Sequence, residues 1–505
     1  MSKNHYFIYL RQIKFIMIKD ISKKQVIDRI KFENPWWVSG HIEDDYNEMQ
    51  RRLYFDLFKG LVYEKSIRRA IVLMGPRRVG KTVMLFHLVE DLISEGINPK
   101  KIIFITIENP IYNNITPEQL FSYAKEATGL EDKSDWYVIF DEIQYCRDWE
   151  LHLKSLVDSY RKDKFIVSGS ASAALKYASM ESGAGRFTDF LLPPLTFAEY
   201  ISFKGFERII TKAKNIWAGP VDDFYSSSHI DEMNKHFVDY INYGGYPEVI
   251  FSEKIRANPG RYIRQDIVDK VLLRDLPGIY GINDTRELNS LFTGIAYNTG
   301  NEFSLEGLSQ QSQVPKSTLK KYIEYLEAAH LIKKVRRIDQ SGKRFQRDNF
   351  FKIYLTNPSL RSALFSPLTS TDEMMGNMVE TAIFAQWMHS RNISPMYARW
   401  KNGEVDMVGL DDATLKPAWA LEIKWTDRFF NKPNELKSLY KFCNENKLNN
   451  AIVTTISREG SVKLKGLDLS FMPSSVFAYT IAKYTLRDGG IGSVFQSNMN
   501  YKKSP

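Results

Sequence analysis

The sequence has little of the chemistry that builds disulfide or metal frameworks. Its 505 residues include two cysteines, Cys146 and Cys443, which are too few for a disulfide network and lack metal-ligand spacing. This scarcity favours a reducing, cytoplasmic setting and predicts no zinc site. No apolar run reaches membrane-spanning length, and the apolar stretch at residues 5–18 is broken by Arg11 and Lys14. We therefore expect neither a membrane partner nor a signal peptide.

The composition that is present suits a conventional multidomain protein. Hydrophobic residues make up 43% of the chain, which is enough for ordinary cores. A chain of 505 residues divides into about three or four domains. The formal net charge of +9 is modest for this length and does not by itself indicate nucleic acid. Function must therefore be sought in local motifs.

A glycine-bearing loop separates a short apolar run at residues 71–74 from a helical pattern at residues 83–93. It fits G-x-x-x-x-G-K-[ST], whose glycines let the backbone curl and point its N–H groups at phosphate oxygens. Lys81 would neutralise the β and γ phosphates, and Thr82 would offer its hydroxyl to Mg²⁺. The predicted phosphate loop consists of Gly75, Pro76, Arg77, Arg78, Val79, Gly80, Lys81 and Thr82.

An apolar strand ending in two acids supplies the second part of such a site. Residues 136–140 are apolar and run into Asp141 and Glu142. Asp141 is placed to hold the Mg²⁺ shell, and Glu142 is placed to polarise the attacking water. A further apolar strand ends in small polar residues, so Ser168 or Ser170 would contact the γ-phosphate or that water.

With these motifs in this order, residues 68–200 resemble an AAA+ ATPase. The resemblance implies an α/β P-loop core, a parallel five-stranded sheet between helices, with strands at residues 101–107 and 187–192. It also implies ATP rather than GTP, with Mg²⁺ as cofactor. Arg186 stands where AAA+ proteins carry an arginine that reaches the γ-phosphate of a neighbouring subunit, which would require a homo-oligomer. Capping of a helix or pairing with Asp189 is the alternative.

A second region has the order of a DNA-binding module. Residues 303–310 predict a capped helix, residues 315–327 predict an amphipathic helix, and a basic extended segment follows. This order resembles a winged helix-turn-helix. DNA would meet Lys316, Ser317, Thr318, Lys320 and Lys321. The basic wing would contain Lys333, Lys334, Arg336, Arg337, Lys343, Arg344 and Arg347. Winged helices also bind proteins, and basic runs are often solvated faces, so DNA and a protein partner both remain open.

The carboxyl-terminal third contains two strand patterns joined by a turn at residues 409–416. Asp406 lies in the first strand, and Glu422 and Lys424 share one face of the second because strand side chains alternate. Asp406 and Glu422 would converge on a divalent ion while Lys424 orients or activates water. These are the parts of metal-assisted phosphodiester hydrolysis.

This arrangement resembles the core of the PD-(D/E)XK nuclease superfamily over residues 348–486. In that superfamily a preceding helix carries another glutamate, a position that Glu380 matches. The resemblance implies a restriction-endonuclease-like α/β domain with a second divalent ion held by Glu380, Asp406 and Glu422. Three alternatives remain: an active nuclease, a fold that binds without cutting, and a charged solvent face.

The whole order resembles a widespread group of uncharacterised prokaryotic ATPases. We predict an extension (1–45), an AAA+ core (46–200), a helical lid (201–255), a winged helix (256–347), a nuclease-like domain (348–488) and a flexible tail (489–505). The Trp-Trp cluster at residues 34–37 should pack on the core, and residues 243–248 should form a hinge near the nucleotide. The predicted function is an ATPase coupled to a DNA-directed domain, in defence, repair or mobile-element control. The alternative is a nucleotide-controlled switch that recruits protein partners and cuts nothing.

Overall fold

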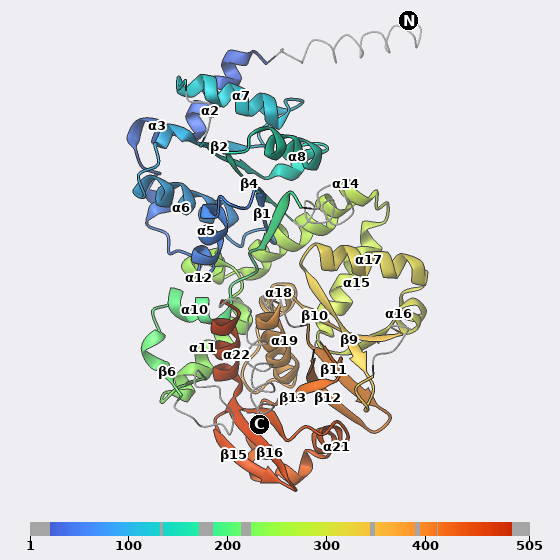
Figure 1. Cartoon of the computed structure of the whole chain (residues 1–505). Coiled ribbons are helices and arrows are strands. Elements are labelled where there is room, and N and C mark those ends of the chain that lie inside the picture. The colour runs from blue at the N-terminus through green and yellow to red at the C-terminus, as the bar shows by residue number, and fades with distance from the viewer. Residues whose placement is uncertain are drawn as a thin grey trace, which may run out of the picture.

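The structure is a computed structural model that describes residues 21–131, 135–170, 185–213, 224–343, 349–388, 394–411 and 413–486. Figure 1 shows the chain running from an amino-terminal α/β layer in blue and cyan to a carboxyl-terminal sheet in orange and red. The predicted tail at residues 489–505 and the first twenty residues lie outside the described part. Among the described helices, none is long and apolar enough to cross a membrane.

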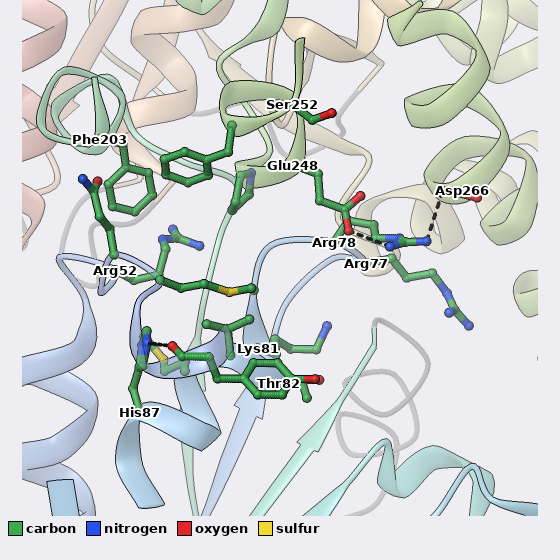
Figure 2. A pocket seen from close by; sticks show the side chains of 18 of the residues that line it. Arg52, Arg77, Arg78, Lys81, Thr82, His87, Phe203, Glu248, Ser252 and Asp266 are labelled. Atoms are coloured by element: carbon green, nitrogen blue, oxygen red, sulfur yellow. Dashed lines mark hydrogen bonds and ion pairs between the residues drawn. The ribbon is translucent and has the colours of Figure 1, made fainter. Parts of the chain in front are cut away.

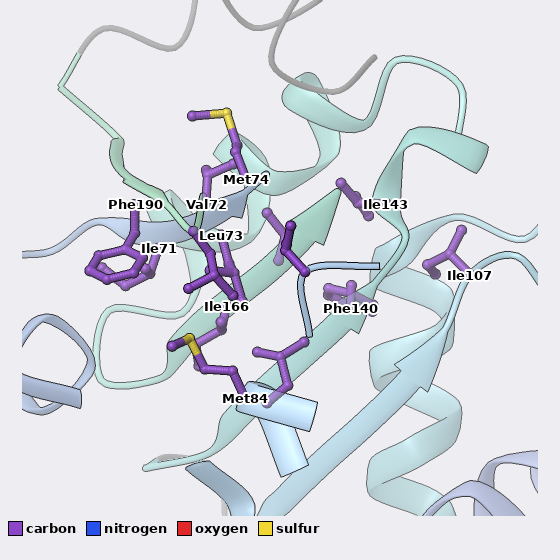
Figure 3. Packing of buried hydrophobic residues seen from close by; sticks show 14 of the residues in the cluster. Ile71, Val72, Leu73, Met74, Met84, Ile107, Phe140, Ile143, Ile166 and Phe190 are labelled. Carbon is purple, nitrogen blue, oxygen red and sulfur yellow. The ribbon is translucent and has the colours of Figure 1, made fainter. Parts of the chain in front are cut away.

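Five parallel strands form the amino-terminal sheet in the order β2-β3-β4-β1-β5, which confirms the predicted sheet. Buried apolar strands of this kind are typical of parallel sheets covered by helices. The strands are β1 Ala70–Met74, β2 Ile102–Thr106, β3 Tyr137–Asp141, β4 Lys164–Gly169 and β5 Phe187–Leu191. The helices that share their hydrophobic core are α2 Lys23–Glu33, α3 Trp36–Ser39, α5 Phe55–Tyr63, α6 Lys81–Ser94, α7 Pro117–Thr128 and α8 Trp149–Ser159. Figure 3 shows Val72 and Leu73 of β1 packed with Ile166 of β4.

Side chains from the amino-terminal extension close the outer edge of strand β2. The Asn34 amide donates to the Phe104 carbonyl and accepts from the Phe104 N–H, both at 2.7 Å. The indole N–H groups of Trp36 and Trp37 donate to the Ile102 carbonyl at 3.1 and 2.8 Å. An edge strand otherwise presents unpaired backbone groups. The tryptophan cluster therefore packs on the core, as the sequence predicted.

Helices and turns connect this sheet to the rest of the chain. They are α10 Phe197–Phe203, α11 Ile230–Tyr243, α12 Pro247–Phe251, α13 Glu253–Arg256, η6 Gly260–Asp269, η7 Val271–Asp275 and α14 Leu276–Tyr280. The two elements η6 and η7 are π-helical. Long π-helices are unusual, because most π-helical hydrogen bonding occurs in single turns. We call residues 260–275 the connecting segment.

The winged-helix region, named for the fold predicted for residues 256–347, contains two helices and a strand pair near the predicted positions. Its elements are α15 Thr285–Tyr297, β8 Glu302–Ser304, α16 Leu305–Ser312, α17 Lys316–Ala328, β9 Ile332–Ile338 and β10 Phe350–Leu355. Helix α16 begins two residues later than predicted, because residues 302–304 form strand β8 and pair with β10. Strands β9 and β10 pair antiparallel and form the wing.

Nine strands form a second, continuous sheet in the order β15-β16-β14-β13-β12-β11-β9-β10-β8. The wing joins it because β9 pairs in parallel with β11, with Arg337 opposite Tyr397 and Ile338 opposite Ala398. The predicted boundary between residues 347 and 348 therefore falls inside one hairpin of a shared sheet. The carboxyl-terminal strands are β11 Met396–Trp400, β12 Gly403–Leu410, β13 Pro417–Glu422, β14 Asn450–Thr455, β15 Gly460–Leu464 and β16 Leu467–Pro473.

Helices cover this sheet and return the chain to the lid. They are α18 Ser359–Leu364, α19 Met375–Trp387, α21 Lys437–Glu445 and α22 Ser474–Thr485. The last helix, α22, packs against α19, α10 and α11, and Figure 1 shows it in red beside these helices. The carboxyl-terminal sheet is therefore fastened to helices α10 and α11, which follow the amino-terminal sheet in the chain.

Candidate functional site

The phosphate loop joins the carboxyl end of β1 to the amino end of α6. A Cβ on Gly75 would lie 2.0 Å from the carbonyl oxygen of Leu192, at a φ of +156°. Gly80 has a φ of +91°, in the left-handed region that favours glycine. The backbone therefore requires both glycines of the motif. The loop lies at the carboxyl end of a parallel sheet, where α/β folds bind ligands.

Lys81 is held inside the loop by backbone oxygens and not by a carboxylate. It is 6% exposed, and Nζ donates to the carbonyl oxygens of Gly75 and Pro76, both at 3.0 Å. Burial lowers the pKa of the ammonium, and the charges of Glu142 and Asp141 offset this in part. Within the described ranges Lys81 has no ion-pair partner. An anionic ligand would supply the missing countercharge.

Asp141 ends strand β3 beside the loop. Thr82 Oγ1 donates to Asp141 Oδ2 at 2.9 Å, and the Ser168 hydroxyl donates to Oδ1. Burial, aided by the charge of Glu142, raises the pKa of Asp141 to about 6, although the two hydroxyls lower it. The charge of Lys81 also lowers this pKa, but among the described residues no cation contacts the Asp141 carboxylate directly. The donor set of a hydroxyl and a carboxylate fits Mg²⁺, which prefers oxygen ligands.

Glu142 follows Asp141 and lines a cavity that opens over the phosphate loop. Its φ of +54° is in the left-handed region, and its N–H donates to Ser168 Oγ at 3.2 Å. The Gln144 amide donates to the Glu142 carboxylate, and Gln144 Oε1 accepts from the Ser170 N–H at 3.3 Å. Left-handed conformations of non-glycine residues are strained and cluster at functional sites. The sequence prediction missed Gln144, whose only signal is its position two residues after the acidic pair.

Arg186 lies at the opposite end of the sheet from the phosphate loop. Its carbonyl accepts from the Ala70 N–H, and Ala70 begins strand β1. Arg186 Nε contacts Asp158 at 2.5 Å, and both side chains are 44% exposed. The described contacts thus give Asp158, not Asp189, as the partner of Arg186. Because β1 and β5 are parallel, Arg186 is too far from its own loop, and a role on a neighbouring subunit's nucleotide remains a prediction.

Arg52 and Glu199 form a buried ion pair that the sequence prediction missed. Arg52 Nη1 donates to the Val79 carbonyl of the loop at 2.5 Å, and Nε contacts Glu199 Oε1 at 2.6 Å. Arg52 Nη2 donates to the Pro193 carbonyl at 3.0 Å. Arg52 is 6% exposed and Glu199 is fully buried. The pair fastens the phosphate loop to helix α10. The capping box between Thr196 and Glu199 is the local signal, but nothing in the sequence links Glu199 to Arg52.

A cavity of about 970 Å³ opens over the loop. Its lining includes Lys81, Thr82 and Glu142. Apolar and aromatic side chains also line it, namely Tyr46, Met49, Phe203, Pro247, Phe251 and Ile255. The predicted hinge contributes Pro247 and Glu248, and Figure 2 shows Glu248 and Asp266 paired with Arg78 at the cavity wall. Charged side chains that suit phosphates and apolar side chains that suit a base therefore line the same cavity.

The predicted residues of the nuclease-like site also meet. Lys424 Nζ lies 3.0 Å from Asp406 Oδ2 and 2.8 Å from Glu422 Oε1. Burial works to raise the pKa of Asp406, but Lys424, Lys352 and the Ile423 N–H outweigh it and lower the pKa. Burial and the charge of Asp406 raise the pKa of Glu422 to about 7. The Lys424 ammonium therefore pairs with two buried carboxylates. Because its pKa is lower, Asp406 loses its proton more readily than Glu422 does.

Lys352 of strand β10 fills the other half of this cluster, and the sequence prediction missed it. It is 3% exposed, and Nζ lies 2.8 Å from Glu380 and 2.6 Å from Glu404. Tyr354 donates to Glu380 at 2.5 Å. These acids and Asp406 raise the pKa of Lys352 despite its burial. The nearby polar cavity of about 440 Å³ is lined by Glu302, Lys352, Glu380, Arg399, Glu404 and Asp406.

The residues of this acid cluster do not fit a divalent ion as they stand. Glu380, Asp406 and Glu422 were predicted as ligands, but each is paired with an ammonium group, from Lys352 or Lys424. A resident ammonium uses the lone pairs and the negative charge that a metal needs. Across the described part of the chain, no group of three or more His, Cys, Asp or Glu side chains has an arrangement suited to a metal ion.

The basic residues predicted to meet DNA are largely at the surface. On α17, Lys316, Ser317, Lys320 and Lys321 are exposed and Thr318 is half-buried. Lys316 pairs with Glu306. On the wing, Lys333 and Arg336 are exposed, Lys334 and Arg337 are half-buried, and Lys343 is exposed. Arg344 and Arg347 lie outside the described residues.

Comparison with known proteins gives two family matches. Residues 67–201 match a model described as an AAA domain, and residues 234–372 match a model described as a domain of unknown function, DUF8612. An uncharacterized protein of Haemophilus influenzae is 25% identical over 342 residues, which cover 67% of this chain and 78% of that protein. The uncharacterized protein MJ1544 of Methanocaldococcus jannaschii is 24% identical over 403 residues, which cover 78% of this chain and 83% of that protein.

Solved structures show only a distant likeness. The ORC2 protein of Aeropyrum pernix aligns with a TM-score of 0.33 and 12% identity, over 61% of this chain and 91% of that protein. The ORC1 protein of the same organism aligns with a TM-score of 0.29 and 11% identity, over 65% of this chain and 95% of that protein. The family match, the strand order and the loop geometry agree. Residues 67–201 are therefore an AAA domain, which implies a P-loop nucleoside-triphosphate site.

Proposed function

We propose that the chain is a Mg²⁺-dependent ATPase whose nucleotide state controls its winged-helix and carboxyl-terminal domains. The observation that carries the proposal is that a buried ammonium and a buried carboxylate lie at the phosphate loop without a direct ion pair. Among the described residues, Lys81 donates to two carbonyl oxygens, and the Asp141 carboxylate accepts from two hydroxyls. Lys81 and the loop N–H groups would bind the phosphates, and Thr82 and Asp141 would hold Mg²⁺. Bound Mg²⁺ neutralises charge on the β and γ phosphates.

The neighbouring polar residues support hydrolysis. Glu142 would accept a proton from the attacking water, and Gln144 orients its carboxylate through the hydrogen bond between them. Ser168 or Ser170 would contact the γ-phosphate, since both lie within this hydrogen-bonded chain. The apolar side chains of the cavity would hold the base and exclude water. Arg186 would act on a neighbouring subunit, so full activity would require a homo-oligomer.

Two variants and a matched control test the ATPase. Lys81→Ala should abolish binding of a fluorescent ATP analogue, because it removes the charge that faces the phosphates. Glu142→Gln should retain ATP and lose turnover, because the amide cannot accept the water's proton. Lys100→Ala removes a lysine from the exposed surface of the same domain and should behave as wild type. Unchanged hydrolysis in both site variants would refute the proposal.

For the carboxyl-terminal domain, the ion pairs of Lys352 favour a binding role over cleavage. In the nuclease alternative, Glu380, Asp406 and Glu422 would hold a divalent ion and Lys424 would orient water. That arrangement first requires Lys352 to leave Glu380. In the binding version, the exposed lysines of the winged helix would contact a DNA or protein partner, and the carboxyl-terminal domain would bind the same partner without cutting it. Defence, repair and mobile-element control are settings that suit either version.

A cleavage and binding assay separates the alternatives. Plasmid and linear DNA are incubated with wild type and Lys424→Ala, with Mg²⁺ or Mn²⁺, and with or without ATP. We expect no cleavage by either protein and salt-sensitive DNA binding that Lys320→Ala with Lys321→Ala weakens. Metal-dependent nicking that only wild type shows would establish the nuclease. Absence of both cleavage and binding would favour a protein partner.

A further inference from the structure

Two arginines of the phosphate loop, Arg77 and Arg78, form ion pairs with the connecting segment. Arg77 places Nε and Nη2 on the two oxygens of Asp275 at 2.8 and 3.2 Å, with side chains 11% and 17% exposed. Arg78 donates to Glu248 at 2.6 Å and to Asp266 at 3.1 Å, as Figure 2 shows. Bidentate arginine–carboxylate pairs are among the stronger ion pairs in proteins. The loop is therefore fastened to residues 260–275 at two points.

The helical geometry of the segment brings these two aspartates to the same side. Asp266 lies in η6 and Asp275 ends η7, nine positions later. In an α-helix of about 3.6 residues per turn, nine residues make about two and a half turns and place the side chains on opposite faces. With i→i+5 hydrogen bonding, about 4.4 residues complete a turn, so nine residues make about two turns and share a face. The π-helical geometry and the two ion pairs therefore support each other.

The connecting segment packs directly on the winged-helix region. Element η7 contacts α15, and η6 contacts α18, the helix that follows wing strand β10. Leu272 and Ile267 share one hydrophobic core with Leu288 of α15. Tyr280 of the next helix stacks on Tyr325 of α17, with ring centroids 3.7 Å apart. These contacts form a packed route from the segment to the helix predicted to meet DNA.

We propose that Asp266 and Asp275 are positioning residues that tie the phosphate loop to the connecting segment and report nucleotide occupancy to the winged helix. This inference rests on the proposed nucleotide site. A bound triphosphate carries several negative charges beside Arg77 and Arg78, so it competes with the carboxylates for the guanidinium groups and repels the carboxylates. Nucleotide and ion pairs therefore oppose each other. Coupling between two equilibria is reciprocal. The free energy by which the ion pairs weaken nucleotide binding therefore equals the free energy by which bound nucleotide weakens the ion pairs.

The test uses the full chain and two measurements. Amide hydrogen exchange of residues 260–297 is followed with and without ATPγS and Mg²⁺, and affinity is measured with a fluorescent ATP analogue. The test variant is Asp266→Asn with Asp275→Asn, which keeps side-chain shape and removes charge. The matched control is Asp269→Asn, in the same segment, because Asp269 faces Arg264 at 3.8 Å and not the loop.

In wild type and the control, we expect nucleotide to speed exchange in the segment by about fivefold or more. In the double variant, exchange should be fast without nucleotide and unresponsive to it, and nucleotide affinity should rise by about fivefold or more. A retained response, or an affinity that does not rise, would overturn the inference. If wild type binds nucleotide but hydrogen exchange in the segment does not change, this inference is wrong while the proposed nucleotide site stands. Absence of binding to wild type would overturn the nucleotide site as well.

Discussion

The nucleotide cavity and the acid cluster use the same chemical groups and differ in how their charges are matched. At the phosphate loop, Lys81 contacts carbonyl oxygens and Asp141, behind Thr82, contacts hydroxyls. In the acid cluster, Lys352 and Lys424 each bridge two carboxylates. A site with unmatched charges gains by binding a charged ligand, whereas a matched site must first break its own ion pairs. Convergence of catalytic residue types is therefore not enough to make a ligand site.

The largest expected effect tests the unmatched side of this comparison. Asp141→Asn removes the charge proposed to hold Mg²⁺, so Mg²⁺-dependent ATP hydrolysis should fall by about 1,000-fold, or about 4 kcal/mol in barrier height. Steady-state phosphate release measures it. Asp468→Asn removes an exposed acid of strand β16 and should leave hydrolysis unchanged. Hydrolysis by Asp141→Asn within tenfold of wild type would contradict the proposed metal role.

The next effect concerns a buried pair inside the nucleotide-binding half. Arg52→Met leaves the buried Glu199 carboxylate without its counter-charge, so the free energy of unfolding should fall by about 3 kcal/mol. Urea unfolding followed by tryptophan fluorescence measures the loss. Adding Glu199→Leu removes the stranded carboxylate and should recover most of the stability. If Arg52→Met alone is as stable as wild type, the ion pair between Arg52 and Glu199 contributes little to the stability of the fold.

A third variant converts the matched site into an unmatched one. Lys352→Met removes the ammonium between Glu380 and Glu404, so the acid cluster should acquire a Mn²⁺ site that wild type lacks. Mn²⁺ at 100 times its Kd would then stabilise the variant by about 2.7 kcal/mol, measured as a shift of Tm. Lys333→Met, on the exposed side of the neighbouring strand, should gain no site. Wild-type Mn²⁺ binding that Asp406→Asn abolishes would contradict the assignment of Lys352 as the resident cation.

The smallest effect concerns a buried group with no charge partner. Burial, with smaller contributions from Lys81 and Lys333, lowers the pKa of His330 to about 4, and its buried Nε2 has no hydrogen-bond partner among the described residues. Because the unfolded chain binds this proton near pH 6.5, His330 stabilises the fold fully above that pH and less as pH falls. Between pH 7 and pH 5 the loss should be about 2 kcal/mol.

His330→Asn supplies the control for this titration. Asparagine tolerates the left-handed φ of +53° at this position and does not titrate. The difference between wild type and His330→Asn in urea unfolding at pH 7 and pH 5 isolates the contribution of the ring. An equal loss in both proteins would assign the acid sensitivity to other groups.

The sequence predicts the parts of each site that depend on neighbouring residues. The glycines of the phosphate loop, the acidic end of β3 and the alternation that places Lys424 near Glu422 all follow from local spacing. The parallel pairing of the core strands also follows, because consecutive β-α units give parallel sheets. The amphipathic pattern of α17 predicts its bounds within one residue at each end.

The missed features depend on contacts between distant segments. Arg52 and Glu199 are 147 positions apart, and the capping box that contains Glu199 gives no sign of Arg52. Lys352 follows the pattern of a wing strand, and its burial arises because β9 joins the wing to β11 in one sheet. The predicted domain boundary divided that sheet for the same reason. Charge pairing across such a junction leaves no periodic signal in a single sequence.

The closed edge of strand β2 limits how copies of this chain can assemble. Asn34, Trp36 and Trp37 already occupy backbone groups of Phe104 and Ile102 to which an added strand would bond. A second subunit therefore cannot extend the parallel sheet from this side. In any ring where Arg186 reaches the nucleotide of a neighbouring subunit, the subunits must therefore contact each other through helices and loops. Removal of residues 21–45 would expose the edge of β2 and make the protein prone to unspecific self-association.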